Sequence, residues 1–297
     1  MKLALAGDTM LGRGVADRLE REPPESLFAP ELVEIAREAD LFVLNLECCI
    51  SARGEPWPGR VFHFRAPPWA TQALVHLGVD CVTLANNHAL DFGYDALLDT
   101  LAHLDAAGIR VVGAGTDLEL ARAPVVLDGV TIVAFTDHPR EYAAAANRPG
   151  VAFGPPDALP EAEFVLVTPH WGPNMTTEPP RGVRRTAETL LDAGATLIAG
   201  HSAHVFHGVA PRVLYDLGDF VDDYRIDPKL RNNLGLLFLV DVAGNELEAV
   251  PLKLEFTHTR LATGDDAAWI TRRFTAACAA FGTAVTERDG RLVARWR

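Results

Sequence analysis

Five short apolar runs of the chain each end in a polar side chain, and this pattern constrains the fold more than any other feature of the sequence. The runs are rich in Val, Ile, Leu and Ala, and amphipathic segments separate them, which is typical of an α/β protein. The polar residues that follow the runs are, in chain order, Asp8, Glu47, Asn86–Asn87–His88, His170, and His201 with His204. Because ligands bind at the carboxyl ends of the strands in α/β sheets, we expect these side chains to meet at one edge.

The hydrophobic pattern along the whole chain predicts mixed sheets covered by helices. We expect strands at residues 3–6, 41–44, 81–84, 111–112, 131–135, 164–168, 196–199, 213–215, 236–240 and 247–254. We expect helices at residues 30–39, 69–77, 94–107, 182–193 and 267–281. The sequence shows no convincing linker and no internal repeat, so we predict one domain over residues 1–297. Late strands and a C-terminal helix from about 235 to 297 complete this domain.

The composition limits which binding partners and which cellular compartment we expect for this chain. The chain has 27 basic and 40 acidic side chains, which give a formal net charge of −13. A chain this acidic repels phosphate backbones, so we expect no nucleic-acid partner. No apolar run approaches the ~20 residues that a membrane span needs, so we also expect no membrane span. The four cysteines form no CxxC pair, and we interpret them as reduced core residues of a cytoplasmic protein. The oligomeric state stays open.

Each polar residue at a strand end has an ordinary structural role when it is considered alone. A single acid after a strand is commonly a helix cap, and a single histidine is commonly a core residue. Five such positions in succession favour a metal centre, because the same side chains without a cation would bury several unpaired charges. Carboxylates, an amide oxygen and imidazoles suit Mn, Zn, Fe or Ni better than Ca²⁺. We therefore predict a divalent transition metal as cofactor, with one or two ions bound.

Six short motifs carry a resemblance to a known family. They are residues 7–13 (GDTMLGR), 45–47 (NLE), 84–93 (LANNHALDFG), 170–172 (HWG), 200–205 (GHSAHV) and 214–220 (LYDLGDF). In this order they resemble the CapA family of poly-γ-glutamate capsule biosynthesis proteins, a branch of the calcineurin-like metallophosphoesterases. The resemblance implies a four-layer αββα sandwich of mixed sheets, with a metal site at the carboxyl ends of the strands.

The resemblance also implies roles for individual residues. It places ligands of two metal positions at Asp8 and His204 for the first metal, Glu47 as the bridging carboxylate, and Asn87, His170 and His201 for the second metal. His88 matches the imidazole that acts on the leaving group. Asp91 lies one turn beyond His88 and has two open interpretations: it accepts the other ring N–H of His88, or it caps a helix before Tyr94.

Three positions depart from the family pattern. Met10 stands where dimetal phosphoesterases usually have a histidine ligand, so the first metal position has fewer ligands than the second. Ser202 stands where relatives often have histidine, and Asp219 stands where they have asparagine. Met10 leaves open whether one tightly held ion or two ions bind, and the other departures leave open the choice of substrate.

Three further residues are candidates for substrate binding. Arg13 belongs to the first motif and Arg65 to a long loop after Glu47, and both are predicted to hold an anionic group bidentately. The alternative for Arg13 is a surface ion pair. Trp171 is predicted to wall the pocket, and its alternative is packing.

The leading functional hypothesis is a metal-dependent hydrolase. It acts on a phosphoester or on a poly-γ-glutamate or peptide-like substrate, through a metal-activated water and with His88 as general acid. Its catalytic residues are His88, Asp91, Asp8 and Glu47. One alternative is a peptide-modifying epimerase or isomerase that uses the same pocket to abstract and return a proton. Another is a relative without catalysis that binds a polyanion.

Overall fold

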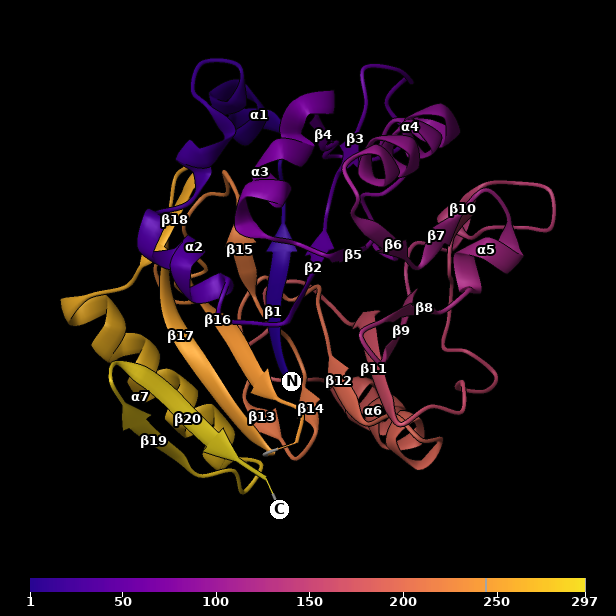
Figure 1. Cartoon of the computed structure of the whole chain (residues 1–297). Coiled ribbons are helices and arrows are strands. Elements are labelled where there is room, and N and C mark those ends of the chain that lie inside the picture. Colours follow the sequence, from indigo (N-terminus) through magenta and orange to yellow (C-terminus); the bar gives the residue numbers. More distant parts are fainter. Residues whose placement is uncertain (244, 297) are drawn as a thin grey trace.

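Two β-sheets face each other at the centre of the protein (Figure 1). The computed structural model describes residues 1–243 and 245–296, and Gly244 and Arg297 lie outside the described residues. The larger sheet has the order β19–β20–β17–β16–β1–β2–β5–β6, while β15 pairs with β1 and β18 pairs with β17. These strands are β1 (Lys2–Thr9), β2 (Leu41–Leu46), β5 (Cys81–Thr83), β6 (Arg110–Val112), β15 (Asp219–Val221), β16 (Leu234–Asp241), β17 (Glu246–Glu255), β18 (His258–Leu261), β19 (Val285–Arg288) and β20 (Arg291–Arg295).

The smaller sheet has the order β13–β14–β12–β11–β9–β8. Its strands are β8 (Val125–Leu127), β9 (Val130–Thr136), β11 (Phe164–His170), β12 (Leu197–Ala199), β13 (Val209–Ala210) and β14 (Val213–Leu214). Parallel pairing joins β1, β2, β5 and β6 in one sheet and β9, β11, β12 and β14 in the other. Two short pairs, β3 (Cys49–Ile50) with β4 (Arg65–Ala66) and β7 (Ala114–Gly115) with β10 (Gly150–Val151), lie outside both sheets.

Strand alternation divides the apolar side chains between separate cores. In β1, Leu3 and Leu5 belong to the core between the two sheets, while Ala4 and Ala6 belong to the core under the helices. Successive side chains of a strand point to opposite faces, so one strand supplies both cores. Both faces of β1 are therefore covered, which explains why its sequence reads as a continuous apolar run.

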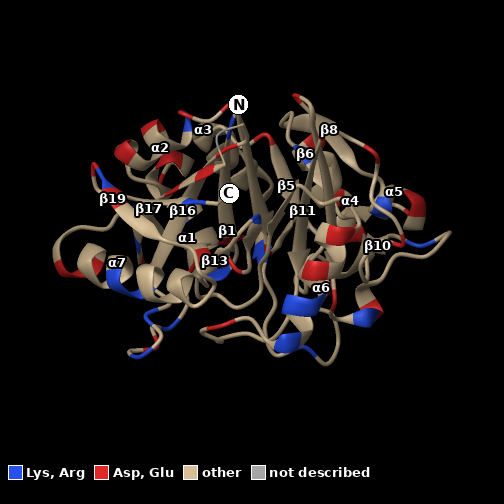
Figure 2. Ribbon diagram, turned by 90° about the horizontal axis from the view of Figure 1, so that it is seen from below, with Lys and Arg blue, Asp and Glu red and all other residues tan. Residues whose placement is uncertain are grey.

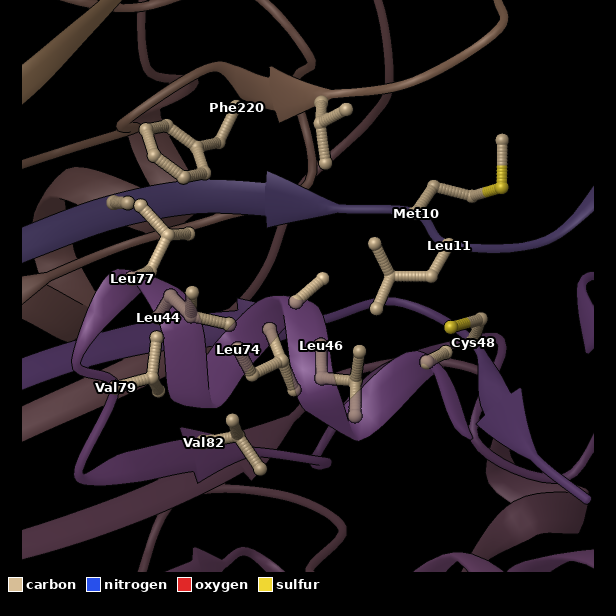
Figure 3. Packing of buried hydrophobic residues seen from close by; sticks show 14 of the residues in the cluster. Met10, Leu11, Leu44, Leu46, Cys48, Leu74, Leu77, Val79, Val82 and Phe220 are labelled. Carbon is tan, nitrogen blue, oxygen red and sulfur yellow. The ribbon is translucent and has the colours of Figure 1, made fainter. Parts of the chain in front are cut away.

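Helices cover the outer faces of the two sheets. The outer core of the larger sheet includes residues of α1 (Arg13–Leu19), α2 (Pro30–Ala36), α3 (Thr71–Leu77) and α4 (Gly93–Ala106). Figure 3 shows part of this core, where Leu74 and Leu77 of α3 pack with Leu44 and Val82 of the sheet. The outer face of the smaller sheet packs on α6 (Arg181–Asp192). The layers are thus helix, sheet, sheet, helix, which confirms the predicted αββα sandwich of mixed sheets.

One long helix packs between the sheets at their side. The helix α7 (Gly264–Ala279) contacts β16 and β17 of the larger sheet and β13 at the edge of the smaller one. Its Phe274 is fully buried and packs against Phe206 and Phe238, with ring centroids 6.2 and 6.1 Å away. This helix therefore belongs to the core between the sheets.

All the predicted strands and the five predicted helices are present, with boundaries that differ by a few residues. The sequence analysis missed two short helices, α1 and α5 (Leu118–Arg122), the strands β8, β15 and β18, the two-residue strands except β14, and the hairpin of β19 and β20 that follows α7. This hairpin has no apolar run long enough to be recognised as a strand pair. It is held by ion pairs such as those of Arg288 and Arg291 with Glu248. Three 3₁₀ turns, Pro24–Leu27, Pro68–Ala70 and Arg140–Tyr142, complete the elements.

The four cysteines are core residues, as the sequence analysis predicts. All four cysteines are buried and unpaired, and burial raises the pKa of Cys48 and of Cys81 to about 12, so these thiols stay protonated at neutral pH. Acidic and basic residues are spread over both sides of the sandwich (Figure 2). Among the described residues, no helix combines the length and the apolar character that crossing a bilayer requires.

The packing of α7 leads to a stability prediction. Phe274→Ala should lower the free energy of unfolding by about 3–5 kcal/mol, because it leaves a cavity between two aromatic rings in the central core. Urea unfolding followed by circular dichroism measures this change. Phe256→Ala is the matched control, since its ring is 70% exposed and should change the stability by less than about 0.5 kcal/mol. If the two substitutions changed the free energy of unfolding equally, the buried position of Phe274 on α7 would be wrong.

Candidate metal centre

The carboxyl ends of the parallel strands bring the predicted polar side chains together. Asp8 at the end of β1 lies beside Asp219 of β15 in parallel register, and His170 at the end of β11 forms an isolated parallel bridge with His201. The two sheets meet here, since the Oδ1 of Asp8 lies 3.5 Å from the Nδ1 of His201. The predicted ligands therefore share one buried edge of the sandwich.

A close backbone contact positions Asp8. Its N–H donates to the carbonyl of Gly218 at 2.8 Å, and a Cβ on Gly7 would lie only 1.8 Å from that same oxygen. The pairing of β1 with β2 is irregular between Ala6 and Asp8, so the strand bulges where it reaches the site. Only glycine at position 7 allows this approach, which links the first motif of the sequence to the turn before β15.

One group of ligand atoms surrounds His204. Its Nδ1 lies 2.8 Å from the Oδ1 of Asp219 and 3.2 Å from the Oδ2 of Asp8. Ser202 and His204 both have left-handed backbones, with φ of 112° and 58°. Such conformations are uncommon outside glycine and occur often at functional sites. They turn the loop after β12 back toward the end of β1.

A second group surrounds Glu47. Its Oε1 lies 3.5 Å from the Nε2 of His170 and 4.0 Å from the Nε2 of His88. Its Oε2 lies 3.9 Å from the Nδ1 of His204, so Glu47 stands between the two groups. Two sets of three residues have ligand atoms within 4.8 Å of one another: Asp8 with His204 and Asp219, and Asp8 with Glu47 and His170.

The unsatisfied polar atoms of the protein concentrate at this edge. Buried atoms without a hydrogen-bond partner include both oxygens of Glu47, the Oδ1 of Asn87, both ring nitrogens of His170, the Nδ1 of His201 and the Oδ2 of Asp219. Buried polar atoms are almost always paired in folded proteins, because leaving one unpaired costs about 1–3 kcal/mol. These orphaned oxygen and nitrogen atoms are the donor types that a divalent transition metal accepts, so the residues fit the implied ion.

The pKa shifts at this edge show how strongly its charges interact. Burial raises the pKa of Glu47 and of Asp219 well above the usual value, and neighbouring carboxylates add to the shift of Glu47. Burial opposes a charge on His204, but the carboxylates of Asp219 and Glu47 outweigh it and raise its pKa. Burial lowers the pKa of His201 to about 4, so this ring is neutral at pH 7 and available as a ligand.

Two asparagines connect the halves of the site. The side-chain amide of Asn45 donates to the Oδ1 of Asp8 at 2.7 Å, and Asn86 donates to the Oδ1 of Asn45 at 3.0 Å. The Oδ1 of Asn86 in turn accepts the backbone N–H of His88. The sequence analysis did not assign a role to Asn45, although a polar residue inside the apolar run 41–46 was a usable signal.

Asp91 contacts His88, which is the first of its two predicted interpretations. The Nδ1 of His88 lies 2.6 Å from the Oδ2 of Asp91, and the ring of Phe64 packs on the imidazole with centroids 4.1 Å apart. The helix α4 begins at Gly93 after Phe92, which forms no side-chain cap, so the cap interpretation is wrong. Asp91 also accepts from the backbone N–H of Phe64 and from the hydroxyl of Tyr142.

Comparison with known proteins places the chain in a family. The model of the bacterial capsule synthesis protein PGA_cap matches residues 2–224. A probable polyglutamine synthesis accessory protein of Mycobacterium tuberculosis is 31% identical over 86% of this chain and 76% of its own length. The PGA biosynthesis protein CapA of Bacillus subtilis is 30% identical over 75% of this chain and 63% of its own length. The chain belongs to the PGA_cap family. The CapA resemblance predicted from the motifs is confirmed.

In this PGA_cap chain, Met10 is not a ligand. Its side chain is fully buried in the core under the helices, where its sulfur accepts the N–H of Gly12 (Figure 3). Asp219, which the sequence analysis treated only as a departure from the family pattern, lies against His204 instead. Ser202 does not take the place of a ligand either, because its hydroxyl donates to the carbonyl of Gly172.

The two arginines predicted to bind substrate have other partners. Arg13 forms a bidentate ion pair with Asp223, with donor–acceptor distances of 3.0 and 2.6 Å, which is the alternative that the sequence left open. Arg65 stacks on the ring of Phe92, with its guanidinium carbon 4.0 Å from the ring centroid. These contacts give no support to a role in substrate binding.

Trp171 packs in the outer core of the smaller sheet. It is 4% exposed, and its Nε1 donates to the carbonyl of Tyr215 at 3.0 Å. It also lines a hollow of about 300 Å³ beside the start of α6, where arginines gather (Figure 2). Its role in substrate binding therefore stays a prediction.

Removal of one imidazole tests the metal centre. His170→Ala should lower the affinity for Mn²⁺ or Zn²⁺ by roughly tenfold or more, since it removes a nitrogen ligand from the group around Glu47. Plasma mass spectrometry of the protein after equilibrium dialysis measures the bound metal. His258→Ala is the control, because this ring contacts the carbonyl of Ser26 outside the cluster. Unchanged binding in His170→Ala would exclude the site.

Proposed function

We propose that the chain takes part in poly-γ-glutamate synthesis as a metal-dependent hydrolase that acts on a γ-glutamyl peptide. The relatives named for polyglutamine synthesis and for PGA biosynthesis support the pathway. The observation that carries the hydrolase proposal is the cluster of orphaned carboxylate, amide and imidazole atoms beside a histidine held by a carboxylate. A polyanion-binding protein does not require that histidine.

The residues divide into those that would hold an ion and those that would handle protons. Asp8, Asp219 and His204 would hold one ion, and Asp8, Glu47 and His170 would hold another, with His201 beside Asp8 and the unpaired amide oxygen of Asn87 as further ligands. A divalent ion bound there polarises an oxygen of the substrate and lowers the pKa of water toward neutrality. Asn45 keeps the carboxylate of Asp8 oriented toward His204 by donating to its other oxygen.

His88 is the residue that would exchange a proton with the leaving group. Its Nδ1–H points at Asp91, which fixes the tautomer and leaves Nε2 facing Glu47. The ring is 7% exposed and packs on Phe64, so it cannot turn away from the cluster without losing that contact. With Nδ1 held in this way, Nε2 takes up a proton and delivers it to the departing nitrogen.

Hydrolysis is tested with two classes of substrate. The protein, loaded in turn with Mn²⁺, Zn²⁺ and Fe²⁺, is incubated with a γ-linked glutamate oligomer and with a phosphodiester. We expect the oligomer to yield new amino groups, which are measured by amine derivatisation. Release of a phosphate monoester without new amino groups would indicate that the protein hydrolyses phosphoesters and not the glutamate oligomer. Deuterium uptake from D₂O without cleavage would favour the epimerase, and no reaction with any metal would exclude the enzyme.

Substitution of His88 separates chemistry from metal binding. His88→Ala should lower kcat by about 10²–10⁴-fold, because it removes the proton donor, and should leave the bound metal unchanged. Steady-state kinetics and metal analysis on the same sample measure both quantities. His258→Ala should keep both at the wild-type level. Full activity in His88→Ala would show that another group donates the proton.

A further inference from the structure

The loop after β3 is fastened to Asp91 at two points. The backbone N–H of Trp57 donates to the Asp91 carbonyl at 2.8 Å, and that of Phe64 donates to its Oδ2 at 2.7 Å. Arg60 lies between these two anchors. Asp91 therefore fixes both ends of the segment that carries Arg60, one through its backbone carbonyl and one through the carboxylate that also contacts His88.

Arg60 lies beside Asn87, a predicted metal ligand, and beside the ring of Tyr142. Its Nη2 donates to the backbone carbonyl of Asn87 at 2.6 Å, and its guanidinium carbon lies 5.2 Å from the ring centroid of Tyr142. The hydroxyl of Tyr142 donates to Asp91, and Trp57 packs edge-on against Tyr142. The guanidinium thus rests on an aromatic surface next to a predicted ligand, which limits the conformations open to it.

Arg60 has no carboxylate partner among the residues that the structure describes. Its one protein acceptor is the carbonyl of Asn87, and its side chain is half-buried. Two other arginines near the loop differ in this respect, since Arg13 is paired with Asp223 and Arg53 with Asp99. Arg65 resembles Arg60 in having only a backbone carbonyl as acceptor, but it lies against Phe92 and not beside a predicted ligand. The guanidinium of Arg60 therefore keeps most of its five donors free, in a fork that matches a carboxylate.

Arg60 lies beside the segment that carries the imidazole. The carbonyl that accepts from Arg60 belongs to Asn87, the residue before His88. The cluster itself contributes the buried carboxylates of Asp8, Glu47 and Asp219. An acidic substrate approaching it needs compensating positive charge at the point where it contacts the protein.

We propose that Arg60 binds an α-carboxylate of the substrate beside the bond acted upon, and so gives the site its preference for an acidic chain. This inference rests on the proposed function. The geometry favours a carboxylate over a neutral group, because the carbonyl of Asn87 holds Nη2 and the described residues offer no carboxylate to the other guanidinium donors. Arg60 is a positioning residue for substrate and takes no part in holding the ion.

Binding to two matched oligomers tests this role. The probes are a γ-linked glutamate pentamer with free α-carboxylates and the same pentamer with α-carboxamides. Titration calorimetry uses full-length, Mn²⁺-loaded protein carrying His88→Ala, which prevents turnover. We expect Arg60→Met to weaken binding of the acidic pentamer by roughly tenfold to a hundredfold and to leave the amide pentamer unchanged. Arg60→Lys should keep part of the preference.

Arg37→Met is the matched control, because the Nη2 of Arg37 also donates to a backbone carbonyl, that of His76, at 2.6 Å. It should bind both pentamers like the parent. Equal binding of the acidic pentamer by the parent and Arg60→Met, or equal loss of both pentamers, would overturn the role of Arg60. Cleavage of the acidic pentamer by the wild type would leave the proposed function standing in that case. If the parent binds neither pentamer, both proposals fail.

Discussion

The burial of several carboxylates at one sheet edge is the constraint on which the rest of this structure depends. Asp8, Glu47 and Asp219 are each 2% exposed or less and lie around His204. Charges removed from water in this way are costly unless a partner neutralises them. The backbone holds these carboxylates in place. They lie at the ends of paired strands, next to the bulge in β1 and the close contact between Gly7 and Gly218. The same rigidity makes the atoms a preformed ligand set.

Asp91 couples this edge to the loop that covers it. One of its oxygens faces His88 and accepts from the backbone of Phe64, the other accepts from Tyr142, and its carbonyl holds Trp57. One residue therefore contacts both the imidazole of His88 and the loop, through its side chain and through its backbone carbonyl. A change of the Asp91 side chain is expected to disturb His88 and the Phe64 end of the loop together.

The sequence predicted the positions of the strand ends well. Parallel pairing brings the carboxyl ends of distant strands to one edge of a sheet, whatever conformation the loops between them adopt. The sequence identified Asp8, Glu47, His170 and His204 for that reason. It could not tell that Arg13 would pair with Asp223 while Arg60 would lie beside Asn87 without a carboxylate partner, since those contacts depend on how the loops fold. It missed the last hairpin because its apolar run is short: Leu292 and Ala294 reach the core, while arginines and glutamates make up much of the rest of the hairpin.

With Met10 in place of the usual histidine, the groups that could hold an ion near His204 are mostly carboxylates. They are Asp8, Glu47 and Asp219, whereas the imidazole of His170 lies beside Glu47. Oxygen-rich sites favour harder cations such as Mn²⁺, and imidazole-rich sites favour Zn²⁺, Fe or Ni. The two positions therefore differ in ligand type. Because Glu47 lies between the two groups, an ion held by one group would change the charge that the other experiences.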